Sequence, residues 1–342
     1  MRYKIVCVIL AAAIAINIIG IFHSMTAADE PSVLPAVSDG DYIKWVEYQV
    51  PLAAMEKALE LDIAAHTADR ELPFARQLAY LAAKYGGNWK NYKAKHLDEL
   101  SKEVENGKTI EELVTNKKGF AYYKEAYSAA VGGLVGEYKI AAPENLSEAT
   151  EVKYGLRAYS PIAHGYSYSH TNDFGVSRSF GFSRRHLGND LFGSVGTPII
   201  AVESGTIANI GWNRYGGWRI GIRSHDGKRY YYYAHLRRKH PFAKDFKVGD
   251  SVFGGDVIGY LGMTGYSDKE DVNGMQIPHL HFGLELVFDE SQLESDNEIW
   301  IDVYNIVNLL KHHTSPVVKS ADDNNYVRKY AYGEELAVRS EE

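Results

Sequence analysis

Apolar side chains recur at helical spacing in the first part of the chain, between residues 41 and 140. Leu52, Met55, Leu59 and Ile63 fall at positions i, i+3, i+7 and i+11, on one face of a helix. Pro73 can open a second helix that ends at the glycines 86 and 87. The pattern therefore predicts a small all-α region over 41–140.

Thr109 and Glu112 form a capping-box pattern ahead of a further helical stretch in the same region. The carboxylates of 41–140 lie at helical spacing among lysines, which is typical of a solvated helix face. No catalytic constellation is predicted here. A spacer, or a domain that docks a protein partner, is the expected role.

The pattern changes to short β-runs separated by glycine over 166–313. Asp226-Gly227 is a hairpin turn signal between two of these runs. Predicted strands cover 197–202, 205–212, 218–223, 229–235, 248–262 and 279–286.

Polar segments lie between and after these regions. Residues 25–40 and 141–165 are expected to be linkers, and 314–342 a loose polar tail. The overall expectation is an α+β multidomain chain, with a membrane helix at its start, a helical region and then a β-rich domain.

An apolar run at residues 5–22 follows Arg2 and Lys4. At about 1.5 Å per residue it reaches roughly 27 Å, close to the thickness of a bilayer's hydrocarbon core. Asp29 and Glu30 follow it, so the charge pattern places the N-terminus in the cytoplasm and the bulk of the chain outside.

The same residues, 1–24, are compatible with a signal peptide, because small residues at 26–28 offer a cleavage site. The run is longer than the usual signal core of about 7–15 residues, which favours a retained anchor. We expect a single-pass membrane protein with its bulk extracytoplasmic. The alternative is a protein secreted after cleavage.

Composition narrows the chemistry. The net charge of −7 argues against a surface that follows nucleic acid. Cys7 is the only cysteine, so neither an intrachain disulfide nor a cysteine-built zinc site can form. A metal in this chain must be held by histidine and carboxylate.

The segment PHLHFGLEL carries two histidines at alternate positions of a predicted strand. Alternate side chains share a face, so His279 and His281 project together. Leu280, Phe282, Leu284 and Leu286 are then expected to face the core. Taken alone, two half-exposed histidines on a sheet are more common than a metal site.

Two other segments add to this pair. RHLGND has a His-x-x-x-Asp spacing, His186 to Asp190, with a glycine that lets the backbone turn. His235 ends an aromatic strand in the sequence YAHL. Two neutral imidazoles and one carboxylate leave zinc with an open fourth position, where it lowers the pKa of bound water to about 7 and polarises a peptide carbonyl. Neighbouring histidines can move a proton or stabilise a developing oxyanion.

The stretch from about residue 173 to 286 resembles the lysostaphin/LytM-type zinc metallopeptidases. The matching segments, in the family's order, are SRSFGFSRRHLGND, GTPIIAVESGTI, RYYYYAHL, VGDSVFGGDVIGYLGMTG and PHLHFGLEL. The resemblance implies a compact, mostly antiparallel β-sheet domain with a groove above the sheet. It also implies cleavage of peptide bonds in peptidoglycan stems or cross-bridges.

The resemblance further implies one Zn2+ per chain, bound by His186, Asp190 and His281. It implies that His279 and His235 activate water and stabilise the transition state. A non-catalytic wall-binding scaffold, or an activator of another wall hydrolase, is the alternative. All three ligand positions and both flanking histidines are present in this chain, which favours the active enzyme.

The chain departs from the family pattern in two expanded loops. Residues 267–278 widen the link before the His pair, and residues 237–247 follow YAHL. Both are expected on the rim of the groove, where loops on a rigid scaffold usually set specificity.

Overall fold

The computed structural model describes residues 42–142, 145–180, 182–321 and 325–334. The signal anchor or signal peptide predicted at 1–24 and the linker at 25–40 lie outside the described residues. In the ranges that are described, no helix is both long enough and apolar enough to cross a membrane.

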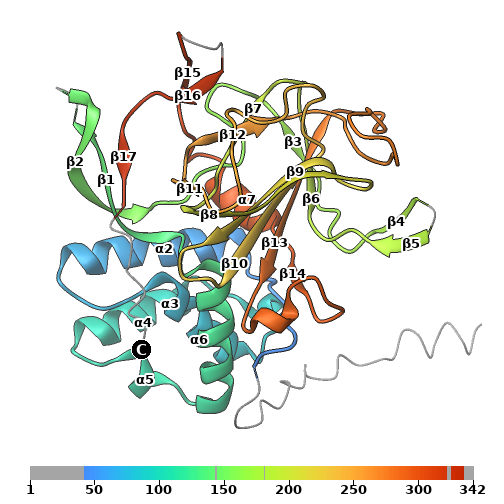
Figure 1. Cartoon of the computed structure of the whole chain (residues 1–342). Coiled ribbons are helices and arrows are strands. Elements are labelled where there is room, and N and C mark those ends of the chain that lie inside the picture. The colour runs from blue at the N-terminus through green and yellow to red at the C-terminus, as the bar shows by residue number, and fades with distance from the viewer. Residues whose placement is uncertain (1–41, 143–144, 181, 322–324, 335–342) are drawn as a thin grey trace, which may run out of the picture.

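A bundle of short helices forms the first part of the described chain (Figure 1). Gly86 adopts a left-handed conformation, with φ of 61°, and ends the second helix as predicted. The capping box of Thr109 and Glu112 is also confirmed, although the helix that it opens is a single turn. The helices are α2 (Leu52–Thr67), α3 (Phe74–Tyr85), α4 (Lys95–Glu105), α5 (Ile110–Leu113) and α6 (Lys117–Val131).

The apolar stripe predicted on α2 is only partly correct. Met55 is fully buried, but 36% of Ile63 is exposed. The buried face is formed largely by alanines, among them Ala54 and Ala58. These small residues let α2 approach α3 and α4. The helix is therefore turned about its own axis, so that the alanines face the core and part of the predicted apolar face is exposed.

An eight-stranded antiparallel sheet forms the second part, in the order β11-β8-β9-β10-β13-β6-β3, with β14 also paired to β13. The mostly antiparallel sheet expected from the sequence is confirmed. Its strands are β3 (Ser169–His170), β6 (Asn189–Phe192), β8 (Gly205–Asn213), β9 (Gly217–Ser224), β10 (Arg229–Ala234), β11 (Ser251–Val252), β13 (His279–Leu286) and β14 (Ile299–Ile301).

Strands also occur in two segments that the sequence predicts to be irregular. Residues 141–165, expected as a linker, contain a whole strand that pairs with β1, and residues 314–342, expected as a loose tail, contain three strands. One strand of the tail pairs with the distant β1, whereas the other strands form antiparallel pairs with an adjacent segment of the chain, and both kinds of pairing satisfy their backbone groups. The smaller sheets comprise β1 (Val135–Ala142), β2 (Asn145–Leu156) and β17 (Tyr332–Gly333); β7 (Pro198–Ile200) and β12 (Val257–Tyr260); β15 (Val317–Lys319) and β16 (Tyr326–Arg328); and β4 (Ser177–Phe180) and β5 (Phe182–Arg185).

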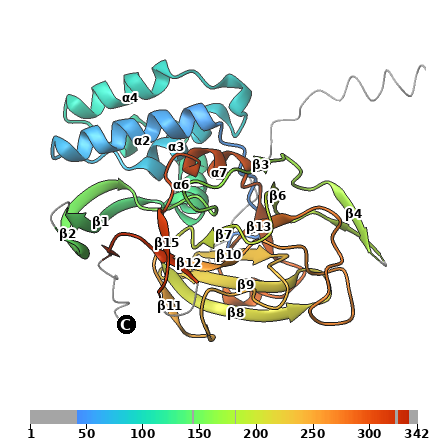
Figure 2. The same cartoon turned by 90° about the horizontal axis from the view of Figure 1, so that it is seen from above.

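The helices and the main sheet share one hydrophobic core. Seen from above, the helices lie to one side of the strands, and α7 (Tyr304–Leu310) lies between them (Figure 2). α7 packs against α2, and its Ile306 and Val307 are buried. Among the described residues, none from α2–α6 lines the open groove that runs over the main sheet.

Candidate metal centre

Strand register brings the predicted site residues together. On β13, His281 lies directly opposite Asp190 of β6 on one side and Ala234 of β10 on the other. Directly opposed residues in an antiparallel pair project to the same face. The four apolar residues predicted to face the core, Leu280, Phe282, Leu284 and Leu286, are at most 1% exposed.

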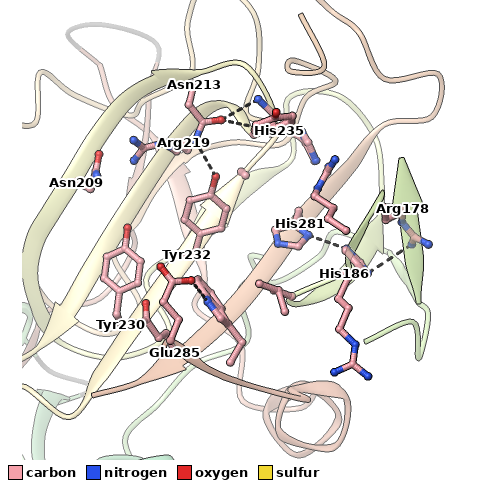
Figure 3. Close-up of a pocket in the computed structure, with 18 of the residues that line it drawn as sticks. Arg178, His186, Asn209, Asn213, Arg219, Tyr230, Tyr232, His235, His281 and Glu285 are labelled. Atoms are coloured by element: carbon pink, nitrogen blue, oxygen red, sulfur yellow. Dashed lines mark hydrogen bonds between the residues drawn. The ribbon is translucent and has the colours of Figure 1, made fainter. Parts of the chain in front are cut away.

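Three of the predicted residues form a cluster of potential metal ligands. The Nε2 atom of His186 lies 2.8 Å from Nδ1 of His281 and 3.1 Å from Oδ1 of Asp190. The third edge, from His281 Nδ1 to Asp190 Oδ1, measures 3.4 Å. Figure 3 shows the His186 and His281 rings facing each other, linked by the dashed line.

Hydrogen bonds outside the cluster orient His186. Its Nδ1 lies 3.0 Å from the backbone oxygen of Asp173. A carbonyl can only accept, so Nδ1 carries the proton and Nε2 is left free to bind a metal. The Asp173 carboxylate accepts hydrogen bonds from Arg178 at 2.6 Å and from the Asp190 backbone at 3.2 Å. Neither Asp173 nor Arg178 was predicted from the sequence.

The electrostatics of the cluster favour a cation. Burial alone would raise the pKa of Asp190, but its contacts with His186 and His281 hold that pKa well below its usual range. Burial opposes protonation of His186, yet the Asp173 and Asp190 carboxylates raise its pKa to about 9. Both shifts mean that the buried carboxylates attract positive charge to this cluster.

The residues present fit zinc. Tetrahedral zinc with bonds of about 2.0–2.1 Å separates its ligands by roughly 3.3 Å, close to the three edges of the cluster. Asp190 Oδ1 is buried and accepts no hydrogen bond from the described residues. A buried acceptor without a donor is unfavourable unless a cation satisfies it. Two imidazoles and one carboxylate also form a ligand set typical of catalytic zinc.

The two remaining predicted histidines lie beside the cluster. His279 Nε2 is 3.7 Å from Asp190 Oδ1, and the rings of His235 and His279 are 4.8 Å apart. His235 Nδ1 donates to Thr264 O and His279 Nδ1 to Ile277 O, both at 2.8 Å. Each ring therefore has a free Nε2 that can accept a proton. Burial, together with repulsion from His279 and His281, lowers the pKa of His235 well below its ordinary value, so this ring is neutral at pH 7.

An open groove of about 650 Å³ runs over this face of the sheet and includes all five histidine and aspartate residues of the centre. Glycines lie beneath two of the aromatic side chains that line it. A Cβ on Gly221 would lie 2.1 Å from the Tyr230 hydroxyl, and one on Gly283 would lie 2.8 Å from the Trp300 ring. The aromatic rings can therefore approach the strands this closely only because these positions lack side chains.

One wall of the groove is the β4–β5 hairpin, which projects from the body of the molecule (Figure 1). Arg184 from this hairpin lies 4.9 Å from the rings of both Tyr215 and Tyr266. The contact links the hairpin to the loops on the other side of the metal centre.

The two expanded loops meet near the opposite rim. Asp271 of the 267–278 loop accepts hydrogen bonds from Lys239 N at 2.8 Å and from Trp218 Nε1 at 2.9 Å. Met275 from the same loop lines the groove, whereas no residue of 237–247 lines it. The rim position predicted for both loops thus holds for 267–278. The 237–247 loop does not line the groove and instead contacts 267–278 through Lys239.

The residues at the far end of the groove were not predicted from the sequence. Glu285 on β13 faces the groove with Tyr230 and Trp300 directly opposite on the neighbouring strands. It lies two positions beyond Gly283 on the same face as the histidine pair. The alternation of PHLHFGLEL placed it on this face, but only the pairing of three strands reveals what surrounds it.

Comparisons with known proteins agree with this geometry. Residues 184–293 match the model of peptidase family M23. Over 124 residues, 36% of this chain, the sequence is 44% identical to the L-Ala–D-Glu endopeptidase of Bacillus subtilis, and over 98 residues, 28% of this chain, it is 42% identical to lysostaphin of Staphylococcus staphylolyticus. The matched regions span 36% and 18% of those two proteins.

A solved structure extends the likeness in fold beyond this domain. A candidate glycyl-glycine endopeptidase lytM from Ruminococcus gnavus superposes with a TM-score of 0.51 at 20% identity, covering 81% of this chain and 94% of that one. At this identity the likeness concerns the fold alone. The family match covers the segment that holds the His-Asp-His cluster, so residues 184–293 have the sequence of a peptidase family M23 domain and are similar to the lysostaphin/LytM-type peptidases.

Proposed function

We propose that this protein is a zinc-dependent endopeptidase that hydrolyses peptide bonds in peptidoglycan stems or cross-bridges. The observation that carries the proposal is the His186–Asp190–His281 cluster, whose ligand atoms all lie within 4.8 Å of one another on the floor of an open groove. These three residues would hold the ion. When bound there, zinc supplies Lewis-acid polarisation of a peptide carbonyl and acidifies a coordinated water.

The chain's own histidines perform the proton transfers. His279 and His235 each have Nδ1 fixed by a backbone carbonyl and a free Nε2, so each can accept a proton at Nε2. The low pKa of His235 keeps that ring neutral, ready to accept a proton and afterwards to donate it to the departing amine. The groove aligns an extended peptide over the strands, which holds its carbonyl next to these rings.

The relatives' names favour a peptide of the bacterial wall as substrate. One is named for an L-Ala–D-Glu bond and another is lysostaphin, whereas a third, from Staphylococcus capitis, is named for a glycyl-glycine bond. Because these names differ in the bond that is cut, the bond cut by this chain is left to experiment.

The proposed location is extracytoplasmic, with the chain held in the membrane by residues 1–24 or secreted after their cleavage. The basic residues before the apolar run and the acidic residues after it support this placement. It matches a substrate that lies outside the cytoplasmic membrane.

The full chain loaded with zinc, incubated with purified peptidoglycan and followed by mass spectrometry, tests the activity. We expect new free amines from one defined peptide bond. Asp190→Ala should lose both zinc and cleavage, whereas His279→Ala should keep about one zinc per chain and lose cleavage. If the zinc-loaded chain cuts none of several wall types, the activity is refuted and the scaffold or activator role takes its place.

A further inference from the structure

Glu285 is enclosed at the far end of the groove. It is 2% exposed and lines the groove, and its Oε1 accepts no hydrogen bond from the described residues. A carboxylate in this state is strongly unfavourable unless a ligand supplies the missing donor. Figure 3 shows Glu285 in the groove with Tyr230 and Tyr232, on the opposite side of the view from Arg178.

The charges around Glu285 favour a cationic ligand. Glu298 and Glu294 line the same end of the groove, and both add negative potential at Glu285. Arg223 opposes them and lowers the pKa of Glu285, but it is itself paired with Glu290 at 2.9 Å. Arg219 is the other positive side chain among the lining residues at this end. Burial and the neighbouring Glu298 raise the pKa of Glu285 to about 8, the behaviour of a carboxyl group that lacks a cation.

The position of Glu285 suits a substrate contact away from the reacting bond. It lies four residues beyond His281 on β13, or about 14 Å at about 3.4 Å per residue. An extended peptide covers this distance in roughly four residues, and a long side chain reaches it from nearer the cleaved bond. The rings of Tyr230 and Trp300 on the neighbouring strands, at 78° to each other, provide apolar walls for the methylene part of such a side chain.

We propose that Glu285 forms a specificity subsite that binds a primary ammonium group of the substrate peptide. The ammonium comes either from the side chain of a diamino acid or from a peptide N-terminus. Its N–H groups donate to the free Oε1, and Tyr230 and Trp300 enclose it. The inference rests on the proposed endopeptidase function, since it assigns part of the same groove to substrate choice.

The test compares three forms of the peptide that the full chain is found to cut. One keeps only the side-chain amine, one keeps only the N-terminal amine, and one has both acetylated. For the unsubstituted chain, kcat/KM should be about tenfold or more higher for one of the amine-bearing forms than for the doubly acetylated form. In Glu285→Gln, which keeps the side-chain shape, the three values should converge. Glu148→Gln, an exposed strand residue away from the groove, should keep the preference.

A pH series separates a substrate contact from a structural role. The ratio of kcat/KM for the side-chain amine form to the acetylated form should rise between pH 6.5 and 8.5 as Glu285 ionises, since the amine itself titrates near 10.4. Any effect of pH on the metal centre changes the cleavage of both peptides equally, so it cancels in this ratio. The charged groups facing Glu285 are Glu294, Glu298, Arg219 and Arg223.

The outcomes separate the two proposals. Equal cleavage of all three peptides, or a preference that persists in Glu285→Gln, overturns the subsite and leaves the peptidase function standing. If the parent chain cuts no peptide, calorimetry measures the binding of peptidoglycan stem peptides, prepared in the same three forms, to the zinc-loaded His279→Ala chain. Selective binding of an amine form without hydrolysis by the parent chain refutes the activity and supports the subsite.

Discussion

His235 combines a buried ring with an unusual backbone conformation. Its φ is 62°, a left-handed value that most residues avoid, and its N–H donates to Gly216 O at 2.7 Å. This turn at the end of β10 points the ring at the metal centre. Asparagine tolerates the left-handed region better than alanine, so the two substitutions separate the ring's function from the turn's stability.

We expect His235→Asn and His235→Ala both to lower kcat by about 10²–10⁴-fold with zinc content unchanged. The alanine variant should also lose up to about 1 kcal/mol of stability relative to the asparagine variant. Steady-state kinetics, metal analysis and urea unfolding measure the three quantities. Near-normal kcat in His235→Asn would remove His235 from the proton transfers.

Glu285 should make stability depend on pH. Its pKa is raised to about 8 in the fold against an ordinary value near 4.5, so the folded state holds a proton that the unfolded state has released. The stabilisation from that proton is complete below about pH 4.5 and is lost as the pH rises to 8, by up to about 1.4 kcal/mol per unit.

Urea unfolding at pH 5, 6.5 and 8 checks this expectation. Glu285→Gln does not titrate, so its stability relative to the parent chain should increase steadily across the series. The exposed substitution Glu148→Gln should show no such trend. A constant difference between Glu285→Gln and the parent chain would mean that Glu285 is ionised in the fold at neutral pH.

Single site residues could be predicted from the sequence where a motif coincides with alternating apolar and polar positions. His279 and His281 could be placed on one face from PHLHFGLEL alone, and the structure puts them there. Asp173 could not be predicted, because it acts through its backbone oxygen and through a pairing with Arg178 that local sequence does not encode. The surroundings of Glu285 likewise depend on three strands meeting.

Among the elements, the expanded loops carry the clearest expectation. Asp271 connects the 267–278 loop to Lys239 and Trp218, which holds that loop, with Met275, at the rim. Shortening the loop by removing 268–276 should change which bond is cut, because loops on a rigid scaffold usually set specificity. The product profile from peptidoglycan, read by mass spectrometry, measures this.

Asp271→Ala is the matched control for the deletion. It keeps the loop's length and removes its anchor, so it should weaken the preference for the original bond without replacing it. An unchanged product profile in the deletion variant would show that the loop does not select the bond.

Regular strands were predictable where glycine and alternation mark them, as for β13 and β10, whose bounds match the predicted runs within a residue. β2 was not. Its residues are mostly exposed or half-buried, with only Gly155 buried, so no apolar alternation marks the strand. It exists because β1 pairs along most of its length and β17 extends the same sheet.

For the molecule as a whole, a buried arginine joins the helical part to the sheet. Arg229 of β10 is 1% exposed and donates to Glu203 at 2.7 Å and to Asp226 at 2.6 Å. It also donates to the Ala129 carbonyl at 2.7 Å, near the C-terminal end of α6, where a cation is favourable. The sequence predicted separate helical and β-rich regions. It could not predict this connection, because it joins residues 100 positions apart.

This arrangement predicts that the helices and the sheet unfold together. Arg229→Met leaves Glu203 buried without its cation and α6 without a donor at its end, which should cost about 3–5 kcal/mol. The exposed Arg70, 3.6 Å from Glu105, is the matched control, and Arg70→Met should cost less than about 1 kcal/mol. Hydrogen exchange should then accelerate in peptides from α6 and β10 alike in Arg229→Met. Faster exchange in β10 with α6 unchanged would show that the helical part is stable on its own and that the shared core does not make one cooperative unit.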